Sequence, residues 1–262
     1  MKTALITGAS GGIGYELAKI FAKNGNDLVL AARSQDKLKT IKKELEGEYK
    51  VKVDLYPADL SVAGSAMGLY EHCQSNHIVI DYLINNAGYG DYKSVVDADP
   101  EVLSNMLRLN IITLTELTTL FVKDMVKRND GRILNIGSTA AYQPVPRLAA
   151  YAASKAYVVS FSEALHAELK KSKVSVTVLS PGVTATGFID RAGMAHSANA
   201  QGTQAEPAKV ANAGYRAMLK GKLYVIPGLL NKLMALGSRM MPSRSLVLAV
   251  ADSVSKEQKG RS

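Results

Sequence analysis

A glycine-rich turn near the start of the chain constrains the fold more than any other feature. The segment Thr7-Gly8-Ala9-Ser10-Gly11-Gly12-Ile13-Gly14 directly follows the apolar run Ala4-Leu5-Ile6. Gly8 permits a tight turn, a small residue near Gly12 lets the backbone approach a ligand, and Gly14 lets a helix pack closely on the strand. The pattern predicts a strand, a turn and a helix whose free N–H groups bind a dinucleotide pyrophosphate. The expected contacts are Gly8, Ser10, Gly11, Gly12, Ile13 and Gly14.

Apolar runs of strand length alternate with longer stretches of helical period, which is the pattern of a doubly wound α/β fold. The expected strands are Lys2–Thr7, Asp27–Ala32, Val51–Tyr56, Asp81–Asn85, Arg132–Gly137, Val174–Leu179 and Leu223–Ile226. Helix starts are expected where a capping side chain or an early proline suits the first turn, at Asp36, Ser61, Asp99-Pro100 and Glu206-Pro207. No repeat or low-complexity linker divides the 262 residues, so we expect one domain over 1–226 and a C-terminal extension over 227–262.

Composition argues against several classes of protein. No stretch approaches the ~18 uncharged apolar residues of a spanning helix, and the first apolar run ends at Thr7-Gly8, before it is long enough for a secretion signal. The single cysteine, Cys73, forms no internal disulfide and fits a reducing compartment. The four histidines lack the spacing of metal ligands, so no metal site is expected. These features predict a cytoplasmic protein.

Most of the net charge of +9 lies near the C-terminus, since residues 216–262 contain nine basic and two acidic residues. No aromatic interleaving accompanies this charge, so nucleic acid is not an expected partner. The extension also holds apolar segments at 227–236 and 246–251. Two interpretations stay open: a helix that covers a substrate pocket or a subunit interface, and a weak contact with an anionic membrane surface.

The end of the second expected strand bears on the choice of dinucleotide. The run Leu28-Val29-Leu30-Ala31-Ala32-Arg33 offers no carboxylate for a ribose 2′-hydroxyl, and Arg33 follows Gly14 by 19 residues. A guanidinium matches a 2′-phosphate, so NADP(H) is favoured over NAD(H), although a solvated arginine is the simpler alternative. Asp59-Leu60 follows the third strand and suits the adenine edge, but Asp59 equally suits a helix cap.

A second group of residues follows the fifth expected strand. Tyr151 and Lys155 share one helix face at the spacing i, i+4, and Ser138 precedes Tyr151 by 13 residues. Two other Tyr-x-x-x-Lys pairs, at Tyr15 and Tyr89, lack such a serine. Because open α/β sheets bind ligands at the carboxyl ends of their strands, we expect Ser138 and Tyr151 to converge on one site.

Taken together, these residues resemble the classical short-chain dehydrogenase/reductase family up to about residue 226. The family pattern appears at Thr7 to Gly14, Asp59, Asn85-Asn86-Ala87-Gly88, Asn110, Ser138, Tyr151, Lys155, Pro181-Gly182, Thr184 and Thr186. The resemblance implies a single Rossmann-type domain, with a mostly seven-stranded parallel sheet between helices on both faces, and a homodimer or homotetramer. It further implies an NADP(H) site that includes Asn86, Ala87 and Gly88, with Pro181, Gly182, Thr184 and Thr186 as a clamp on the nicotinamide carboxamide.

The implied reaction is hydride transfer between nicotinamide and a ketone, an aldehyde or a secondary alcohol. The carbonyl oxygen gains negative charge and needs a hydrogen-bond donor and then a proton, which Ser138 and Tyr151 can supply. A lysine charge at ~5 Å predicts that Lys155 lowers the pKa of Tyr151 by roughly two units. By resemblance, Lys155 also binds the ribose hydroxyls, and Asn110 orders a water that links Lys155 to solvent.

The substrate is the least constrained part of this interpretation. Residues at about 187–205, with Phe188, Ile189 and Met194, occupy the place where the family has a substrate lid. With Tyr89, Tyr142 and Val145 at its border, the pocket should be apolar and suit a medium-sized ketone, aldehyde or acyl carbonyl. The alternatives are a non-catalytic NADPH-binding redox sensor and a lipid carbonyl reductase at a membrane surface.

Overall fold

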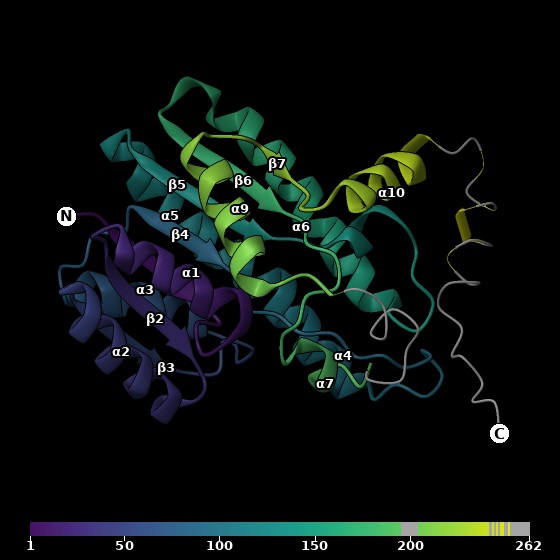
Figure 1. Cartoon of the computed structure of the whole chain (residues 1–262), viewed down its shortest axis with the longest axis horizontal. Helices are drawn as coiled ribbons and strands as arrows, with labels where there is room; N and C mark the ends of the chain where they lie inside the picture. Colours follow the sequence, from purple (N-terminus) through teal and green to yellow (C-terminus); the bar gives the residue numbers. More distant parts are fainter. Residues whose placement is uncertain (195–203, 241–242, 244, 246, 249–250, 252–262) are drawn as a thin grey trace.

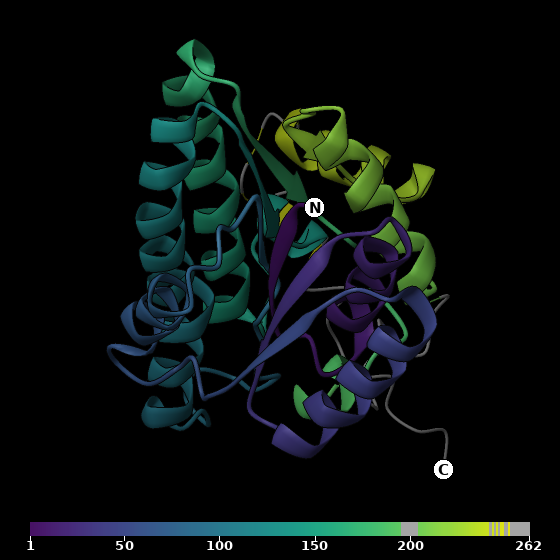
Figure 2. The same ribbon diagram turned by 90° about the vertical axis from the view of Figure 1, so that its left-hand side faces the viewer.

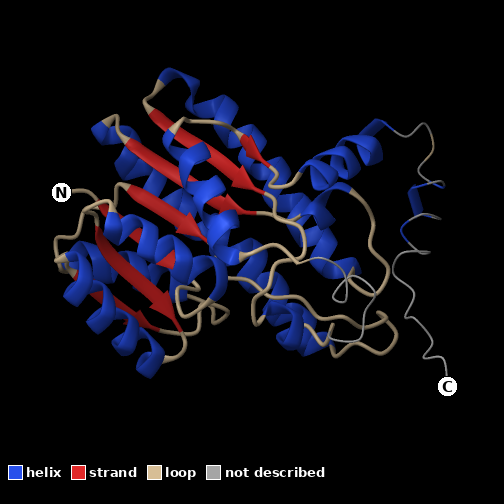
Figure 3. Cartoon of the chain, in the orientation of Figure 1, coloured by secondary structure: helices blue, strands red, loops and turns tan. Residues whose placement is uncertain are grey.

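The computed structural model describes residues 1–194, 204–240, 243, 245, 247, 248 and 251. Within them, seven strands form one parallel sheet in the order β3-β2-β1-β4-β5-β6-β7 (Figures 1 and 3). The strands are β1 Thr3–Thr7, β2 Asp27–Ala32, β3 Val53–Pro57, β4 Tyr82–Asn85, β5 Gly131–Ile136, β6 Val174–Leu179 and β7 Tyr224–Val225. The predicted α/β fold class is confirmed, and each strand boundary lies within two residues of its expected position.

Side chains of each strand alternate between two apolar cores, one on either face of the sheet. In β1, Ala4 and Ile6 pack into one core and Leu5 into the other. Helices α1 Gly12–Lys23, α2 Gln35–Tyr49 and α9 Pro207–Leu219 cover the first face, and α3 Ser65–Ser75, α5 Leu114–Arg128 and α6 Ala149–Glu168 cover the second (Figure 2). Because water reaches neither face, the strands consist of nearly continuous apolar residues.

The strand order reverses beside β1, which pairs with β2 on one side and β4 on the other. At such a switch point the loops leaving the carboxyl ends of the two strands diverge and leave a crevice. The glycine-rich turn follows β1 and Asn86 follows β4. The topology therefore places these two motifs side by side.

Three of the four expected helix starts agree with the structure within one residue, and one does not. The Asp99 side chain caps α4 (Pro100–Leu107) by accepting a hydrogen bond of 2.8 Å from the Glu101 N–H. The expected start at Ser61 is wrong, because α3 begins four residues later, after Gly64. The Asp59 carboxylate accepts hydrogen bonds from the Ser61 N–H and hydroxyl, which holds this segment in a turn.

Further helices connect these elements or follow the last strand. They are η1 Arg108–Thr113, a π-helix between α4 and α5, then η2 Thr139–Tyr142, η3 Leu169–Lys171, α7 Phe188–Arg191 and α10 Leu229–Met240. The sequence contains no recognisable signal for the π-helix. Among the described helices, none combines the length and the apolar character that crossing a bilayer requires.

Candidate active site

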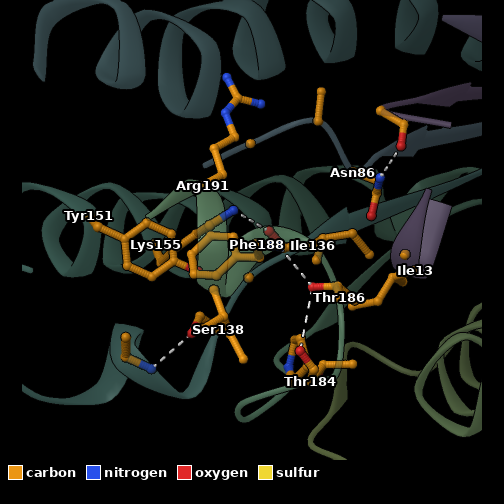
Figure 4. Close-up of a pocket in the computed structure, with 18 of the residues that line it drawn as sticks. Ile13, Asn86, Ile136, Ser138, Tyr151, Lys155, Thr184, Thr186, Phe188 and Arg191 are labelled. Carbon is orange, nitrogen blue, oxygen red and sulfur yellow. Dashed lines mark hydrogen bonds between the residues drawn. The ribbon is translucent and has the colours of Figure 1, made fainter. Parts of the chain in front are cut away.

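A cavity of about 820 Å³ opens at the carboxyl ends of the strands. The predicted site residues that line it are Gly8, Ser10, Gly11, Gly12, Ile13, Arg33, Asp59, Leu60, Asn86, Ala87, Gly88, Ser138, Tyr151, Lys155, Pro181, Gly182, Thr184 and Thr186. Figure 4 labels seven of them, namely Ile13, Asn86, Ser138, Tyr151, Lys155, Thr184 and Thr186. Two predicted residues, Gly14 and Asn110, lie outside this lining and contact residues within it. The fold thus brings together segments from nearly the whole length of the expected domain.

The glycines of the first turn have different structural roles. Gly8 and Gly12 adopt φ values of +66° and +55°, which side chains disfavour, and a Cβ atom on Gly12 would lie 2.9 Å from Thr186 Cγ2. A Cβ atom on Gly11 would meet nothing within 4 Å, so this part of the turn faces open space. The turn therefore leaves room for a phosphate group against its backbone, as the sequence predicts.

Gly14 packs helix α1 against the turn rather than facing the cavity. A Cβ atom there would lie 2.4 Å from the Gly8 carbonyl oxygen and 2.5 Å from Asn86 Nδ2. The same Asn86 amide donates hydrogen bonds to the carbonyl oxygens of Thr7, at 2.9 Å, and Gly8, at 3.2 Å. Asn86 thus ties the loop after β4 to the loop after β1.

We expect Gly14→Ala to lower the free energy of unfolding by about 2 kcal/mol, because the new methyl group must displace backbone. Gly11→Ala is the matched control. It introduces the same methyl group into open space and should change stability by less than about 0.5 kcal/mol. Urea denaturation of both variants measures the difference, and equal stabilities would contradict the close packing at Gly14.

Ser138, Tyr151 and Lys155 converge at one end of the cavity. Ser138 follows β5 and caps η2, its hydroxyl accepting a hydrogen bond of 3.1 Å from the Ala140 N–H. Tyr151 and Lys155 are both buried in the first turns of α6, and both line the cavity with Ser138. The Lys155 Nζ donates to the Ile136 carbonyl oxygen at 2.8 Å. As predicted, Ser138 at the end of β5 and Tyr151 on α6 therefore meet in one cavity.

The protonation of this group differs from the prediction. Burial raises the pKa of Tyr151 to about 12, although the hydrogen bond with Ser138 acts to lower it. Burial also lowers the pKa of Lys155 to about 8. The expectation that Lys155 brings the pKa of Tyr151 toward neutrality is therefore wrong. The Lys155 Nζ lies 5.8 Å from the centre of the Tyr151 ring and bonds elsewhere, so desolvation of the phenol dominates.

Asn110 lies in the π-helix η1 and connects three parts of the site. Its side-chain oxygen accepts a hydrogen bond of 3.2 Å from the Tyr89 N–H, and its Nδ2 donates to the Tyr89 carbonyl oxygen at 3.0 Å. The same Nδ2 lies 3.1 Å from the Ser154 hydroxyl, which donates to the Tyr151 carbonyl oxygen. Asn110 therefore positions the loop after β4 against helix α6. Single-turn π-helices of this kind are frequent at functional sites.

Arg33 and Asp59 meet at the far end of the cavity, where Arg33 Nη1 lies 3.8 Å from Asp59 Oδ2. Burial acts to raise the pKa of Asp59, but hydrogen bonds from Ser61 and the nearby Arg33 hold it below its ordinary value. Asp59 caps the turn at Ser61 rather than helix α3. The cavity lining therefore holds both the positive charge of Arg33 and the negative charge of Asp59.

The segment expected to form the substrate lid packs against Tyr151 in the part that is described. The Phe188 ring of α7 lies 5.3 Å from the Tyr151 ring. Ile189 and Met194 are buried with Val145 in an apolar cluster. Residues 195–203 of the expected lid lie outside the described residues.

The expected border of the substrate pocket is correct at Val145 and wrong at Tyr142 and Tyr89, which are not among the lining residues. Tyr142 is buried, and its hydroxyl lies 3.0 Å from that of Ser180. Tyr89 instead lies beneath Arg191, whose guanidinium is 4.1 Å from the ring centre. Arg191 lines the cavity, and no motif in the sequence identified it.

Helix α10 contributes Asn231, Met234, Ala235 and Ser238 to the cavity lining. Its opposite face exposes apolar side chains at Leu229, Leu230, Leu233 and Leu236. Of the second apolar segment at 246–251, Val247 and Ala251 are buried, whereas 246, 249 and 250 lie outside the described residues. The inner face of α10 therefore belongs to the site, as one of the two interpretations of the extension expects.

Comparison with known proteins agrees with this geometry. The model of the short chain dehydrogenase family matches residues 2–196. A very-long-chain 3-oxoacyl-CoA reductase of Anas platyrhynchos is 35% identical over 189 residues, which are 70% of this chain and 60% of that protein. The chain therefore belongs to the short-chain dehydrogenase family, whose members are oxidoreductases of carbonyl and hydroxyl groups.

Two solved structures extend the similarity over the whole chain. A short-chain dehydrogenase from Sphingobium yanoikuyae in complex with NADPH is 30% identical with a TM-score of 0.83, covering 100% of this chain and 99% of that one. A bulky-bulky ketone specific alcohol dehydrogenase from Comamonas testosteroni is 26% identical with a TM-score of 0.78, covering 100% and 97%. The Anas platyrhynchos protein, by contrast, is matched over only 60% of its length.

Proposed function

We propose that this protein is an NADP(H)-dependent oxidoreductase that reduces the carbonyl group of an apolar ketone, aldehyde or acyl substrate. The observation that carries the proposal is the buried Tyr151 side chain, which lines the same cavity as Ser138 and the glycine-rich turn. A proton donor and a nucleotide cradle that share one cavity are what hydride transfer to a carbonyl requires.

The residues present fit NADP(H). The open space at Gly11 and the left-handed backbone at Gly12 suit the pyrophosphate, and Arg33 suits the 2′-phosphate. Asp59 and Leu60 would hold the adenine edge. The other proposed contacts are Asn86, Ala87 and Gly88 beside the ribose, and Pro181, Gly182, Thr184 and Thr186 at the carboxamide. The solved Sphingobium yanoikuyae structure with NADPH supports this choice. When bound, the cofactor supplies the hydride.

Ser138 and Tyr151 would act on the substrate oxygen. The Ser138 hydroxyl donates a hydrogen bond to that oxygen as its charge grows, and the Tyr151 hydroxyl transfers a proton to it. A pKa of about 12 keeps Tyr151 protonated at neutral pH, so its hydroxyl holds the proton that the substrate oxygen needs on reduction. Lys155, held by the Ile136 carbonyl oxygen, keeps its ammonium beside the phenol below pH 8. The non-catalytic sensor lacks support, because each expected catalytic side chain is in place.

The wall beyond Tyr151 indicates an apolar substrate. It consists of Val145, Leu148, Phe188, Ile189, Met194 and Met234. An acyl chain or a bulky ketone fits such a surface, and the names of two similar proteins, a 3-oxoacyl-CoA reductase and a bulky-bulky ketone alcohol dehydrogenase, support this class.

We further propose that α10 closes the substrate side of the pocket and that a lid at about 187–205 covers it. The outward leucines of α10 suit either a subunit interface or a membrane surface, and both alternatives from the sequence still apply to that face. The homodimer or homotetramer and the cytoplasmic location stay predictions.

The test is NADPH oxidation, followed at 340 nm, with a panel of short and bulky ketones, aldehydes and 3-oxoacyl thioesters. We expect turnover with the bulky apolar carbonyls, and at least about tenfold higher kcat/KM with NADPH than with NADH, because Arg33 matches the 2′-phosphate. NADPH binding without turnover on the whole panel would favour the sensor. Absence of NADPH binding would reject the proposed function.

A further inference from the structure

Arg191 follows the substrate wall and lines the same cavity as Arg33 and Asp59. It is the last residue of α7, and its guanidinium stacks 4.1 Å from the centre of the Tyr89 ring. Figure 4 shows its side chain pointing away from Phe188 and Tyr151. The helix behind it is anchored, because Ile189 is buried and the Ala192 carbonyl oxygen accepts a hydrogen bond of 2.8 Å from the Tyr92 N–H. Arg191 is thus a charged group held in position.

Arg191 lies within electrostatic reach of the Arg33–Asp59 pair. Burial lowers the pKa of Arg191, and repulsion by the Arg33 guanidinium lowers it further, while Asp59 and Tyr89 oppose the shift. Asp59 in turn is stabilised as an anion by both arginines. Arg33 and Arg191 line one cavity in which Asp59 is the acidic residue of the lining, so positive charge is in excess there. A dianion placed between them would remove their mutual repulsion.

We propose that Arg191 is a second guanidinium ligand, with Arg33, for the 2′-phosphate of NADP(H). The inference rests on the proposed function and adds a specificity residue that lies on the substrate side of the cavity. Arg33 follows β2 and Arg191 ends α7, so the phosphate would join two segments that are distant in the sequence. Because Phe188 of the same helix stacks on Tyr151, the phosphate would also hold the substrate wall against the catalytic tyrosine.

The experiment compares NADPH and NADH affinity, by fluorescence titration, for the full chain and its Arg191→Gln variant. We expect about tenfold weaker binding of NADPH, the effect of one charge-assisted hydrogen bond, and NADH binding within about twofold of wild type. Arg191→Lys should recover part of the loss. Arg147→Gln is the matched control, since Arg147 also stacks on a tyrosine, 5.9 Å from the centre of the Tyr92 ring, but outside the cavity lining.

A double-mutant cycle tests whether the two arginines bind the same group. If they share the phosphate, Arg33→Gln and Arg191→Gln should each weaken NADPH binding, and their combined effect should differ from the sum in free energy. Unchanged NADPH affinity in Arg191→Gln would overturn the proposal. An equal loss for NADPH and NADH would also overturn it, since it would place Arg191 at the pyrophosphate or in the packing of α7. Failure of the wild-type chain to bind NADPH would instead reject the proposed function itself.

Discussion

Replacing Tyr151 with phenylalanine should lower kcat for carbonyl reduction about 10³-fold and leave NADPH affinity within about twofold of wild type. The variant removes one oxygen atom from a buried ring. The ring itself keeps its packing against Phe188, so the substrate wall should stay in place. The loss falls on kcat because the proton is needed only as the carbonyl oxygen gains charge.

Steady-state kinetics with NADPH and the best substrate of the panel, together with a fluorescence titration of NADPH, measure the two quantities separately. Tyr157→Phe is the matched control, because Tyr157 lies on the same helix with a partly exposed ring and a hydroxyl 3.0 Å from the Thr115 hydroxyl. That variant should keep full activity. Wild-type turnover in Tyr151→Phe would refute the assignment of Tyr151 as the proton donor.

Replacing Lys155 with methionine should change both turnover and the pH dependence of stability. In the folded chain the pKa of Lys155 is about 8, against an ordinary value of 10.5. Between these values the unfolded chain binds more protons than the folded chain, so the free energy of unfolding rises with pH. Below pH 8 the folded chain carries the full cost of a buried ammonium, about 3 kcal/mol.

Between pH 7 and pH 10, the unfolding free energy of wild type should therefore rise by about 2 kcal/mol relative to that of Lys155→Met. Urea denaturation of both chains at several pH values in this range measures how the difference in unfolding free energy changes with pH. The hydrogen bond to the Ile136 carbonyl oxygen that the variant loses should lower its stability at every pH and does not produce this change. Lys123→Met, which removes a lysine from the exposed face of α5, should show no such gain. A difference between wild type and Lys155→Met that stays constant with pH would contradict the lowered pKa of Lys155.

The same variant should lower kcat for reduction at least about 10²-fold at pH 7, because the ammonium expected to bind the ribose hydroxyls, and so to position the nicotinamide, is lost. In wild type, kcat/KM for reduction should decline as pH rises above about 8, where Lys155 loses its proton. Lys155→Met should show no decline at that pH.

Much of the fold and of the site could be predicted because the signals are local. A strand buried on both faces must be apolar along its length, so Ala4-Leu5-Ile6 and the other runs identify their strands directly. The turn after β1 needs glycine at positions 8 and 12 because its backbone is left-handed there. Tyr151 and Lys155 share a helix face because they are four residues apart and a helix has 3.6 residues per turn. The parallel sheet then brings these local motifs to one edge.

The expectations that the structure corrects concern properties that no single segment determines. The start of α3 shifts because Asp59 bonds to Ser61 instead of capping a helix. The pKa of Tyr151 rises because the packing of the whole site removes water from its hydroxyl. No motif distinguishes Arg191 from the other arginines of the sequence. It becomes a candidate ligand only because the fold stacks it on Tyr89 in the cavity lining.

The sequence by itself therefore determined the fold class, the glycine-rich turn and the side chains proposed as catalytic, because periodicity and turn chemistry depend on neighbouring residues. Tertiary structure alone decided the burial that shifts the pKa values of Tyr151 and Lys155, the wall built by α7 and α10, and the place of Arg191 in the same cavity as Arg33 and Asp59. Desolvation and charge interactions depend on which distant segments the packing brings together, and that information is not local.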